Sequence, residues 1–316
     1  MVNVAVVGTG SCNDKHLEAW SRIPNVNIVG VIDVAEENKQ QLPEAFRSKV
    51  VDRLADLKSV HTDIVDLCVP ANDRADYVRQ VSKEGYHIIC EAPLALNVEE
   101  ASSVLKECQE KNVQIQIGHN LRFSPEYLDA RNQVKSGKIG KPGVMRLASG
   151  TAHPGREFDI FSNLGIHQFD WLTWTFGDVE RVMAKHIKKE RHDGTLIEYA
   201  LITLRMVDQT LAHIELSWAA TETETSFELT GDQGMLTHNS NESYPIDVQL
   251  ATSEIIEESI LDKTALQRQM EYVVKSVEAQ DKTMVTGDDA LKAIRIAEAA
   301  RKSVEIGQPV LLKEVL

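Results

Sequence analysis

The chain has 316 residues, of which 42% are hydrophobic and 26% are charged, and its formal net charge at pH 7 is −14. This length and composition are typical of a soluble globular protein of two domains, with a core large enough to fold without disulfides or metals. The acidic balance disfavours non-specific binding to nucleic acid or to an anionic membrane, and no apolar run is long enough to predict a membrane-spanning helix.

The N-terminus and the cysteines predict a cytoplasmic location. Met1 leads directly into the apolar run VNVAVVG, without the pattern of a signal peptide. The four cysteines are Cys12, Cys68, Cys90 and Cys108, and none of them forms a CxxC pair. We interpret them as reduced thiols, with Cys68 and Cys90 buried in strands. We find no HExxH motif, CxxC motif or carboxylate cluster in the sequence that would predict a metal site.

The first 120 residues alternate between short apolar runs and polar stretches that favour helices. The apolar runs lie at 2–8, 27–33, 63–69, 86–91 and 113–118, and the helix-competent stretches at 13–22, 73–84 and 97–111. Continuous apolar strands joined by helices predict a parallel sheet covered on both faces. We therefore predict a doubly wound α/β domain of the Rossmann type over residues 1–120.

The pattern changes after residue 118, where we predict a second, α+β domain over residues 121–316. From Val144 to about Leu250 the apolar runs are longer and partly alternate, which predicts a large open, mostly antiparallel sheet with one packed face. The predicted helices of this part are 125–136, 160–175, 264–279 and 287–304. We expect the C-terminal helices to pack back on the first domain, since no linker separates the two.

The run VAVVGTGSCND predicts a dinucleotide site. Gly8 and Gly10 follow a strand and precede a helix, where the first glycine permits a tight turn and the second lets the backbone approach a pyrophosphate. The phosphates would bind the free N–H groups of the helix, whose first residues include Ser11 and Cys12. Asn13 replaces the third glycine of the motif, and it would cap the helix or bind phosphate through its amide. Gly-rich turns after strands are common, so this signal needs its context.

Asp33 supplies that context, because it ends the second apolar run 23 residues after Gly10. An acidic residue about 20 residues after the glycines binds the ribose 2′-hydroxyl and repels a 2′-phosphate. Val34 and Ala35 follow it, so no adjacent arginine is available to bind that phosphate. The sequence therefore favours NAD over NADP as cofactor, and the alternative for Asp33 is a solvated turn.

Several motifs together resemble the glucose–fructose oxidoreductase and inositol dehydrogenase family. They are VPAN at 69–72, CEAPLA at 90–95, GHNLRFSPEY at 118–127 and NLGIHQFDWLTWTFG at 163–177, and the resemblance extends through the segment at 289–312. It implies an N-terminal Rossmann domain that carries NAD(P) and a C-terminal domain whose open sheet builds homodimers or homotetramers. Apolar residues on runs such as TLAHIELSWAA, which a lone sheet would expose, also favour a homo-oligomer.

The resemblance assigns roles near the cofactor to three residues of the first domain. Pro70 and Asn72 match positions near the nicotinamide ribose, and Glu91 matches the first residue of the family's Glu-Lys-Pro signature. Pro93 matches its proline, which in the family often follows a cis bond. Ala92 stands where the family has its lysine, which commonly assists the acid–base step.

The resemblance also places His167 in proton transfer and Asn163 where the family usually has an aspartate. A neutral histidine is suited to accept a hydroxyl proton, whereas Asn163 can hydrogen-bond but carries no charge. Asp170 lies three residues after His167, on the same helix face, and is a candidate to orient it. The alternative is that His167 is a structural histidine in a helix rich in tryptophan.

Three residues after the last strand of the first domain are candidates for ligand contacts. Asn120 would contact the nicotinamide or the substrate, and Arg122 and Tyr127 would line the substrate site. Arginine suits a substrate carboxylate, and an interdomain salt bridge is the other interpretation of Arg122.

The function that we predict is an NAD-dependent oxidoreductase acting on a sugar, a polyol or a related small hydroxy compound. The family's catalytic set is incomplete, since Ala92 and Asn163 have replaced its charged groups. One alternative is an NAD-binding protein without turnover that acts as a regulatory or scaffold subunit. The other, implied by the resemblance alone, is a lyase or glycosidase that recycles a bound NAD.

Overall fold

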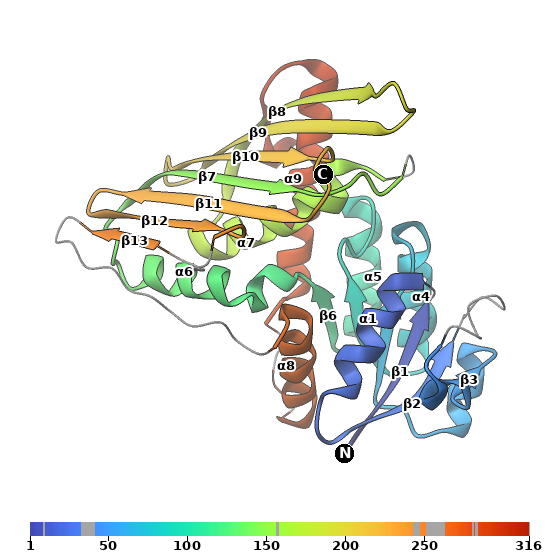
Figure 1. Ribbon diagram of the computed structural model, residues 1–316. Coiled ribbons are helices and arrows are strands. Elements are labelled where there is room, and N and C mark those ends of the chain that lie inside the picture. Colours follow the sequence, from blue (N-terminus) through green and yellow to red (C-terminus); the bar gives the residue numbers. More distant parts are fainter. Residues whose placement is uncertain are drawn as a thin grey trace. The chain divides into compact units, whose positions relative to one another are not determined.

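The computed structural model describes the chain except for residues 9, 33–41, 156–157, 243–246, 251–262, 280, 282–283 and 316, and except for the side chains of 10, 11 and 247–250 (Figure 1). The chain divides into two compact units. Unit 1 comprises Met1–Asn120 and Lys263–Leu291, and unit 2 comprises Leu121–Asp262 and Lys292–Leu316. In the described part of the chain, no helix is both long and apolar enough to cross a membrane.

Unit 1 is built on a six-stranded parallel sheet with the strand order β3-β2-β1-β4-β5-β6. The strands are β1 (Val2–Gly8), β2 (Val26–Ile32), β3 (Val50–Val51), β4 (Ile64–Cys68), β5 (His87–Glu91) and β6 (Ile115–Gly118). The order reverses direction between β1 and β4, which is the switch point where doubly wound sheets bind ligands. The predicted doubly wound fold is confirmed.

Helices cover the sheet of unit 1, and one of them comes from far along the chain. They are α1 (Gly10–Ser21), α3 (Glu44–Arg47), α4 (Ala71–Lys83), α5 (Val98–Glu110), α8 (Ala265–Ala279) and the 3-10 helix η1 (Leu54–Ser59), with the start of α9 (Gly287–Ile306). In Figure 1, α8 lies beside α1. Met270 and Val273 of α8 are buried in one core with Val4 and Leu17, so this late helix completes the hydrophobic core of unit 1.

Unit 2 is built on an eight-stranded sheet with the order β13-β12-β11-β7-β10-β9-β8-β14. The strands are β7 (Pro142–Gly150), β8 (Val179–Glu190), β9 (Leu196–Met206), β10 (Leu211–Ser217), β11 (Glu224–Gly231), β12 (Gly234–Asn239), β13 (Asp247–Leu250) and β14 (Val310–Leu311). All neighbours are antiparallel except β7 and β10, which run parallel. The predicted large, mostly antiparallel sheet is thereby confirmed.

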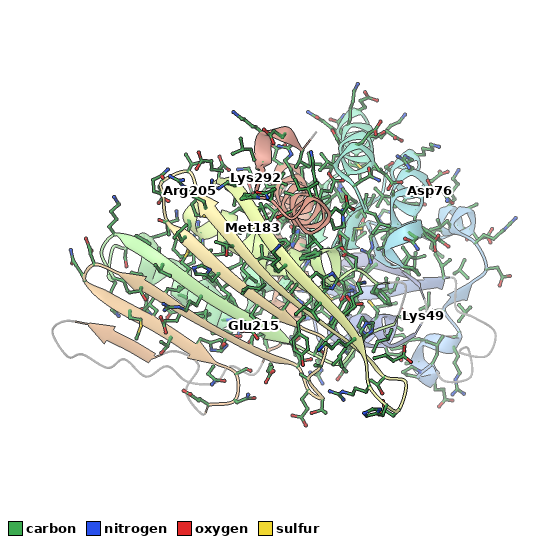
Figure 2. All side chains as sticks on the ribbon, turned by 90° about the horizontal axis from the view of Figure 1, so that it is seen from above. Lys49, Asp76, Met183, Arg205, Glu215 and Lys292 are labelled. Atoms are coloured by element: carbon green, nitrogen blue, oxygen red, sulfur yellow. The ribbon has the colours of Figure 1, made fainter. Side chains whose placement is uncertain are left out.

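The two faces of this sheet differ. Along β9, Ala200, Ile202 and Leu204 are buried, whereas Tyr199 and Leu201, which point to the opposite face, are exposed. The buried face carries α6 (Pro125–Lys135), α7 (Ile166–Phe176) and the later part of α9. The exposed side chains belong to the other face of the sheet. Figure 2 shows this face, with Met183, Arg205 and Glu215 labelled. Burial alternates along such a strand because one face of the sheet packs against helices and the other face does not.

Helix α7 is preceded by a π-helical segment, η3 (Phe161–Gly165), within the predicted helix 160–175. The 3-10 helices η2 (Asn120–Phe123) and η4 (Leu312–Glu314) complete the elements of the described chain. Wide π turns inside helices occur often at functional sites. This one carries Asn163, a predicted site residue.

Candidate functional site

The turn between β1 and α1 has the form of an anion-binding turn. Gly8 has a φ of +139°, and a Cβ added to it would lie 2.3 Å from the carbonyl oxygen of Cys68, so only glycine fits. Helix α1 begins at Gly10 with no acidic residue in its first turn. Its free N–H groups and the positive end of its dipole favour an anion. Phosphate groups of a dinucleotide therefore fit this turn.

The other residues predicted for this turn differ in how the structure describes them. The side chain of Ser11 and all of Asp33 lie outside the described residues, although β2 ends at Ile32, immediately before Asp33. Asn13 lies inside α1 and is 2% exposed, and its carboxamide oxygen has no hydrogen-bond partner among the described residues. The helix starts three residues earlier, so Asn13 does not cap it. The burial of the carboxamide also does not support contact with phosphate.

Three predicted cofactor contacts lie at the same carboxyl edge of the sheet. Pro70 and Asn72 are exposed at the start of α4, directly after β4. Asn120 is exposed just after β6. Because the carboxyl ends of parallel strands share one edge of the sheet, these residues and the glycine turn border the same side of unit 1.

Arg74, at the start of α4, joins two loops of this edge of the sheet. Its guanidinium is buried and donates to the carbonyl oxygens of Pro93 at 2.5 Å and of Val69 at 2.9 Å. The bond between Ala92 and Pro93 is cis, as the resemblance implies. Arg74 therefore joins the loop after β4 to the loop after β5, through main-chain acceptors rather than a charged partner.

Beneath the turn lies a buried ionic cluster that the sequence analysis missed. His16 of α1 is 3% exposed, with its Nδ1 2.8 Å from Asp66 Oδ2 and its Nε2 3.0 Å from Glu91 Oε1. Trp20 donates to the same oxygen of Asp66 at 2.7 Å. Burial alone would lower the pKa of His16, but Asp66 and Glu91 outweigh it and raise the pKa well above its ordinary value. His16 is thus an imidazolium held between two carboxylates.

Two thiols adjoin this cluster. One ligand-type atom each from Cys12, His16 and Cys68 lies within 4.8 Å of the other two. The donor types suit zinc, yet both His16 nitrogens already bond to carboxylates. A hydrogen bond with Cys68 lowers the pKa of Cys12 to about 6 against the opposing effect of burial, with His16 contributing. Burial raises the pKa of Cys68 well above its ordinary value. The cluster therefore combines one acidic thiol with one that holds its proton.

In unit 2, Asn163 and His167 lie four residues apart, across the passage from η3 into α7, and both are half-buried. The start of this segment is held by Asp159, which accepts from the backbone N–H of Ser162 and from Arg301, each at 2.9 Å. Arg301 also donates to the Ser162 hydroxyl at 2.5 Å. These bonds fix the first turn of the segment that presents Asn163 and His167.

Arg122 does not have the surroundings predicted for it. Its guanidinium donates from Nε and from a terminal nitrogen to the two oxygens of Asp170, at 2.8 and 2.6 Å. Arg122 is 1% exposed and its guanidinium carbon lies 4.9 Å from the centre of the Trp174 ring. Arg122 and Asp170 both belong to unit 2, so this ion pair is not an interdomain salt bridge. Because the Arg122 guanidinium donates to both carboxylate oxygens of Asp170, the structure does not support a role for Arg122 in binding a substrate carboxylate.

Tyr127 is likewise a core residue. It is almost completely buried, with its ring 5.2 Å from that of Trp171 and 5.3 Å from that of Phe227. Burial raises its pKa to about 12. The structure therefore does not support Tyr127 as a substrate contact, and its role is to pack α6 against α7 and β11.

A second carboxylate–histidine group, in unit 2, was also missed. Glu198 on β9 is 5% exposed and lies 3.3 Å from His153, 2.7 Å from His186 and 3.1 Å from Lys188. Burial by itself would raise the pKa of Glu198, but hydrogen bonds from Lys188 and the two histidines lower it. Its members come from separate strands and loops, so no local sequence pattern points to the group.

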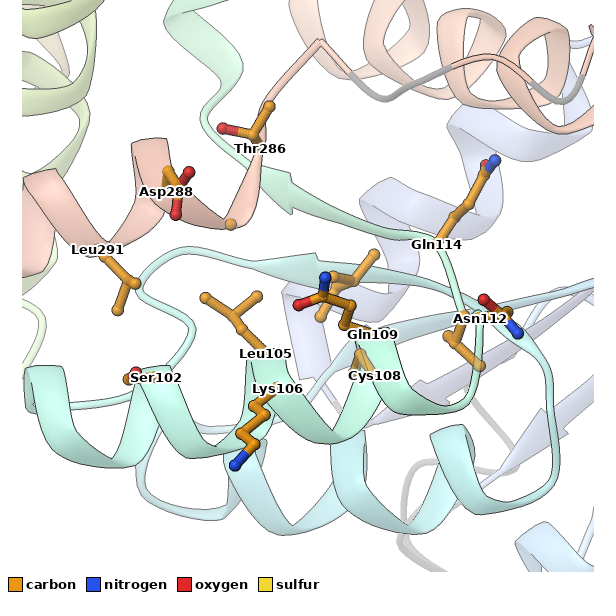
Figure 3. A pocket seen from close by; sticks show the side chains of 13 residues that line it. Ser102, Leu105, Lys106, Cys108, Gln109, Asn112, Gln114, Thr286, Asp288 and Leu291 are labelled. Carbon is orange, nitrogen blue, oxygen red and sulfur yellow. The ribbon is translucent and has the colours of Figure 1, made fainter.

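A pocket in unit 1 lies away from these groups. It has a volume of about 550 Å³ and is lined by α5, the residues before β6 and the start of α9, with Leu105, Gln109 and Asp288 among its side chains (Figure 3). This is the amino end of β6, whereas the glycine turn is at the carboxyl edge of the sheet. We therefore do not assign the candidate site to this pocket.

Two family models match the chain. Residues 2–119 match "Oxidoreductase family, NAD-binding Rossmann fold", and residues 127–237 match "GFO/IDH/MocA C-terminal domain". Similar curated proteins include a myo-inositol 2-dehydrogenase of Thermotoga maritima, 25% identical with 100% of both chains covered. Another is an inositol 2-dehydrogenase of Rhizobium meliloti, 24% identical with 96% of this chain and 97% of the relative covered.

Solved structures share the fold over the full length. A probable dehydrogenase from Thermotoga maritima superposes with a TM-score of 0.85 at 24% identity, covering 99% of this chain and 100% of the other. An oxidoreductase from Agrobacterium radiobacter, solved with NAD+, L-tartaric acid and magnesium, gives a TM-score of 0.87 at 19% identity, covering 100% and 99%.

Proposed function

This chain belongs to the GFO/IDH/MocA oxidoreductase family, and from that premise we propose that it oxidises a sugar, a polyol or a related small hydroxy compound with NAD. The observation that carries the proposal is His167, retained in the first turn of α7 while other groups of the family's set are replaced. Relatives named as inositol dehydrogenases support a polyol as the substrate class.

The cofactor fits the residues of unit 1. Gly8 and the N-terminus of α1 would bind the pyrophosphate, and Asp33 the adenosine ribose. Pro70, Asn72 and Asn120 would border the nicotinamide end, with Glu91 held in place by His16. When bound, NAD supplies the acceptor for the hydride of the carbinol carbon.

A side chain of the protein must accept the proton of the substrate hydroxyl. We assign its removal to the neutral imidazole of His167, a general base whose ordinary pKa suits work near neutral pH. The carboxamide of Asn163, one helical turn earlier, would form a hydrogen bond with the same substrate, as donor or acceptor, and so orient it. Ala92 adds neither charge nor hydrogen bond, so the proposed mechanism relies on one titrating side chain.

The replaced residues also define the second candidate function, an NAD-binding regulatory or scaffold protein. Ala92 and Asn163 are uncharged where the resemblance implies a lysine and an aspartate. This candidate binds NAD and leaves every hydroxy compound unchanged. A lyase or glycosidase that recycles NAD would instead keep the nucleotide through purification and release no NADH. We also propose that the protein is cytoplasmic and homo-oligomeric.

The test is NADH formation, followed by absorbance, with a panel of inositols, sugars and sugar acids. The proposal predicts turnover by the wild type and a loss of about 10²–10⁴-fold in His167→Ala, with NAD affinity nearly unchanged. His192→Ala is the matched control, because His192 is exposed in unit 2, and it should retain full activity. No NADH from any compound, with NAD still bound, would favour the regulatory candidate.

A further inference from the structure

Two of the four cysteines form a pair at the glycine turn. Cys12 belongs to the first turn of α1 and is half-buried, whereas Cys68 is the last residue of β4 and is buried. Their sulfur atoms are at most 4.8 Å apart. The residues are distant in sequence, so their contact arises from the neighbouring positions of α1 and β4.

The surroundings of the pair favour a thiolate on Cys12. The N–H groups at the start of α1 and the imidazolium of His16 stabilise negative charge there, and the neighbouring Cys68 thiol also favours the charged form of Cys12. The opposing groups are the carboxylates of Asp66 on β4 and Glu91 on β5, which His16 bridges. The balance lowers the pKa of Cys12 to about 6, even though burial and Glu91 act to raise it.

The remaining cysteines lack these features. Cys90 is fully buried in β5, and burial raises its pKa to about 12. Burial also raises the pKa of Cys108 in α5, to about 11. A nucleophilic thiol must be both ionised and accessible. Cys12 is therefore the reactive thiol of this chain, and Cys68 is the one thiol in contact with it among the described residues.

We propose that Cys12 and Cys68 form a reversible redox pair, in which a peroxide oxidises Cys12, Cys68 closes a disulfide, and the disulfide weakens NAD binding. In the first step the Cys12 thiolate attacks the peroxide, the O–O bond breaks, and Cys12 becomes a sulfenic acid while hydroxide leaves. In the second step the Cys68 sulfur attacks the Cys12 sulfur, the S–O bond breaks, and the oxygen leaves as water with the Cys68 proton. A dithiol reductant reverses the pair by thiol–disulfide exchange.

The coupling to NAD follows from where the bond forms, and this half of the inference rests on the proposed cofactor site. Cys12 comes two residues after Gly10, at the end of α1 that would face phosphate. The carbonyl of Cys68 is the group that a Cβ at Gly8 would strike. A disulfide requires sulfurs about 2.05 Å apart, so oxidation draws the first turn of α1 towards β4 and changes the turn. By linkage, bound NAD must oppose oxidation to the same degree.

The disulfide is tested with the full-length, reduced protein exposed to hydrogen peroxide and analysed by mass spectrometry. We expect a loss of two hydrogen atoms and a peptide in which Cys12 is joined to Cys68. Cys68→Ser should stop at a sulfenic acid on Cys12 that dimedone traps, and Cys12→Ser should form neither product. Cys108→Ser is the matched control and should behave as the wild type. Oxidation at Cys90 or Cys108 without a Cys12–Cys68 peptide would overturn the proposal.

A measurement on the wild-type protein tests the proposal even where the cysteine variants fail to fold. The rate of Cys12 alkylation by iodoacetamide should reach half its maximum near pH 6, the value to which the pKa of Cys12 is lowered, rather than near the ordinary 9.0. An alkylation profile of Cys12 centred near 9 would contradict the thiolate on which the first step depends.

The coupling is tested by calorimetric titration of NAD into reduced and oxidised protein. We expect at least about tenfold weaker affinity after oxidation, restored by a dithiol, and slower alkylation of Cys12 in saturating NAD. A disulfide that forms without changing NAD affinity would refute the coupling alone. Reduced protein that binds no NAD would refute the cofactor site and the coupling, while the mass spectrometry would still decide the disulfide.

Discussion

Two neutral residues, Ala92 and Asn163, distinguish this site from the one that the resemblance implies. The resemblance implies a lysine and an aspartate of opposite charge at these two positions, so replacing both with neutral residues leaves the net charge unchanged. Restoring the lysine alone would place an ammonium without that carboxylate, which is costly where water is excluded. The two replacements are therefore best interpreted as linked changes.

Ala92→Lys should consequently lower turnover, measured as NADH formation under the assay conditions of the wild type. Ala92→Ser is the neutral control of similar size and should have a small effect. Adding Asn163→Asp to Ala92→Lys supplies the missing carboxylate and should recover part of the loss. A gain of dehydrogenase activity in Ala92→Lys alone would show that the two positions are independent.

Asp33 should determine the choice of dinucleotide. A carboxylate that accepts from the ribose 2′-hydroxyl and repels a 2′-phosphate predicts that NAD binds at least about tenfold more tightly than NADP, a difference of about 1.4 kcal/mol. Calorimetry with both cofactors measures the gap, which Asp33→Ala should narrow. Asp52→Ala, at an exposed carboxylate of unit 1, should leave it unchanged. Equal affinities in the wild type would remove Asp33 from this role.

At the scale of elements, α1 brings together residues whose protonation depends on folding. Folding raises the pKa of His16, so its contribution to stability is complete below about 6.5 and is lost as pH rises through the raised value. Folding lowers the pKa of Cys12 from 9.0 to about 6, so its contribution is present above 9.0 and is lost as pH falls through about 6. Between these limits the two contributions change in opposite directions.

A variant that lacks Cys12 should show the pH-dependent contribution of His16 to stability without the opposing contribution of Cys12. In Cys12→Ser, the free energy of unfolding in urea should fall more steeply than in the wild type as pH rises from 6.5 to 9.0, by at most about 1.4 kcal/mol per pH unit. Cys108→Ser should keep the wild-type dependence. Identical slopes in Cys12→Ser and the wild type would mean that Cys12 is not ionised in the folded protein.

Elements of unit 1 were predictable from sequence because strands buried on both faces read as continuous apolar runs. β1 spans the predicted residues 2–8, and β4 differs by a residue at each end from 63–69. β11 and β12 were not singled out, since their exposed faces carry threonine, serine and glutamate. The glycine turn was found by its spacing, which reflects a local backbone requirement.

The ionic cluster around His16 could not be found in the same way. His16, Asp66 and Glu91 come from three elements, and their pairing depends on the strand order. A signal was nevertheless present, because Asp66 interrupts the apolar run DIVDLCV, and a carboxylate in a fully buried strand requires a partner. Arg122 was misinterpreted for a related reason, since the sequence does not show that Asp170 is its partner.

At the scale of the whole molecule, the exposed face of the unit 2 sheet carries neighbouring apolar side chains. Ile187 and Tyr199 lie opposite each other on β8 and β9 and are 53% and 39% exposed, and Leu201 is 54% exposed. Neighbouring apolar side chains on an otherwise polar surface often mark an interface. Because the sequence implies a homo-oligomer, we propose that this face joins copies of the chain.

The double variant Tyr199→Glu with Leu201→Glu should therefore be a monomer by light scattering at micromolar concentration, where the wild type should be a dimer or tetramer. Val207→Glu is the control, because Val207 is 62% exposed but follows the end of β9, off the sheet face. A wild type that is monomeric under these conditions would contradict the proposed interface.

The most direct test of the proposed reaction is the transfer of deuterium from a carbinol carbon to the cofactor. The protein is incubated with NAD and with inositols or sugars deuterated at their carbinol carbons, and the NADH formed is analysed by mass spectrometry. An NAD-dependent oxidoreductase with His167 as its base predicts deuterated NADH from at least one compound, and a loss of about 10²–10⁴-fold in His167→Ala. NAD that binds but acquires no deuterium from any of these compounds would contradict it.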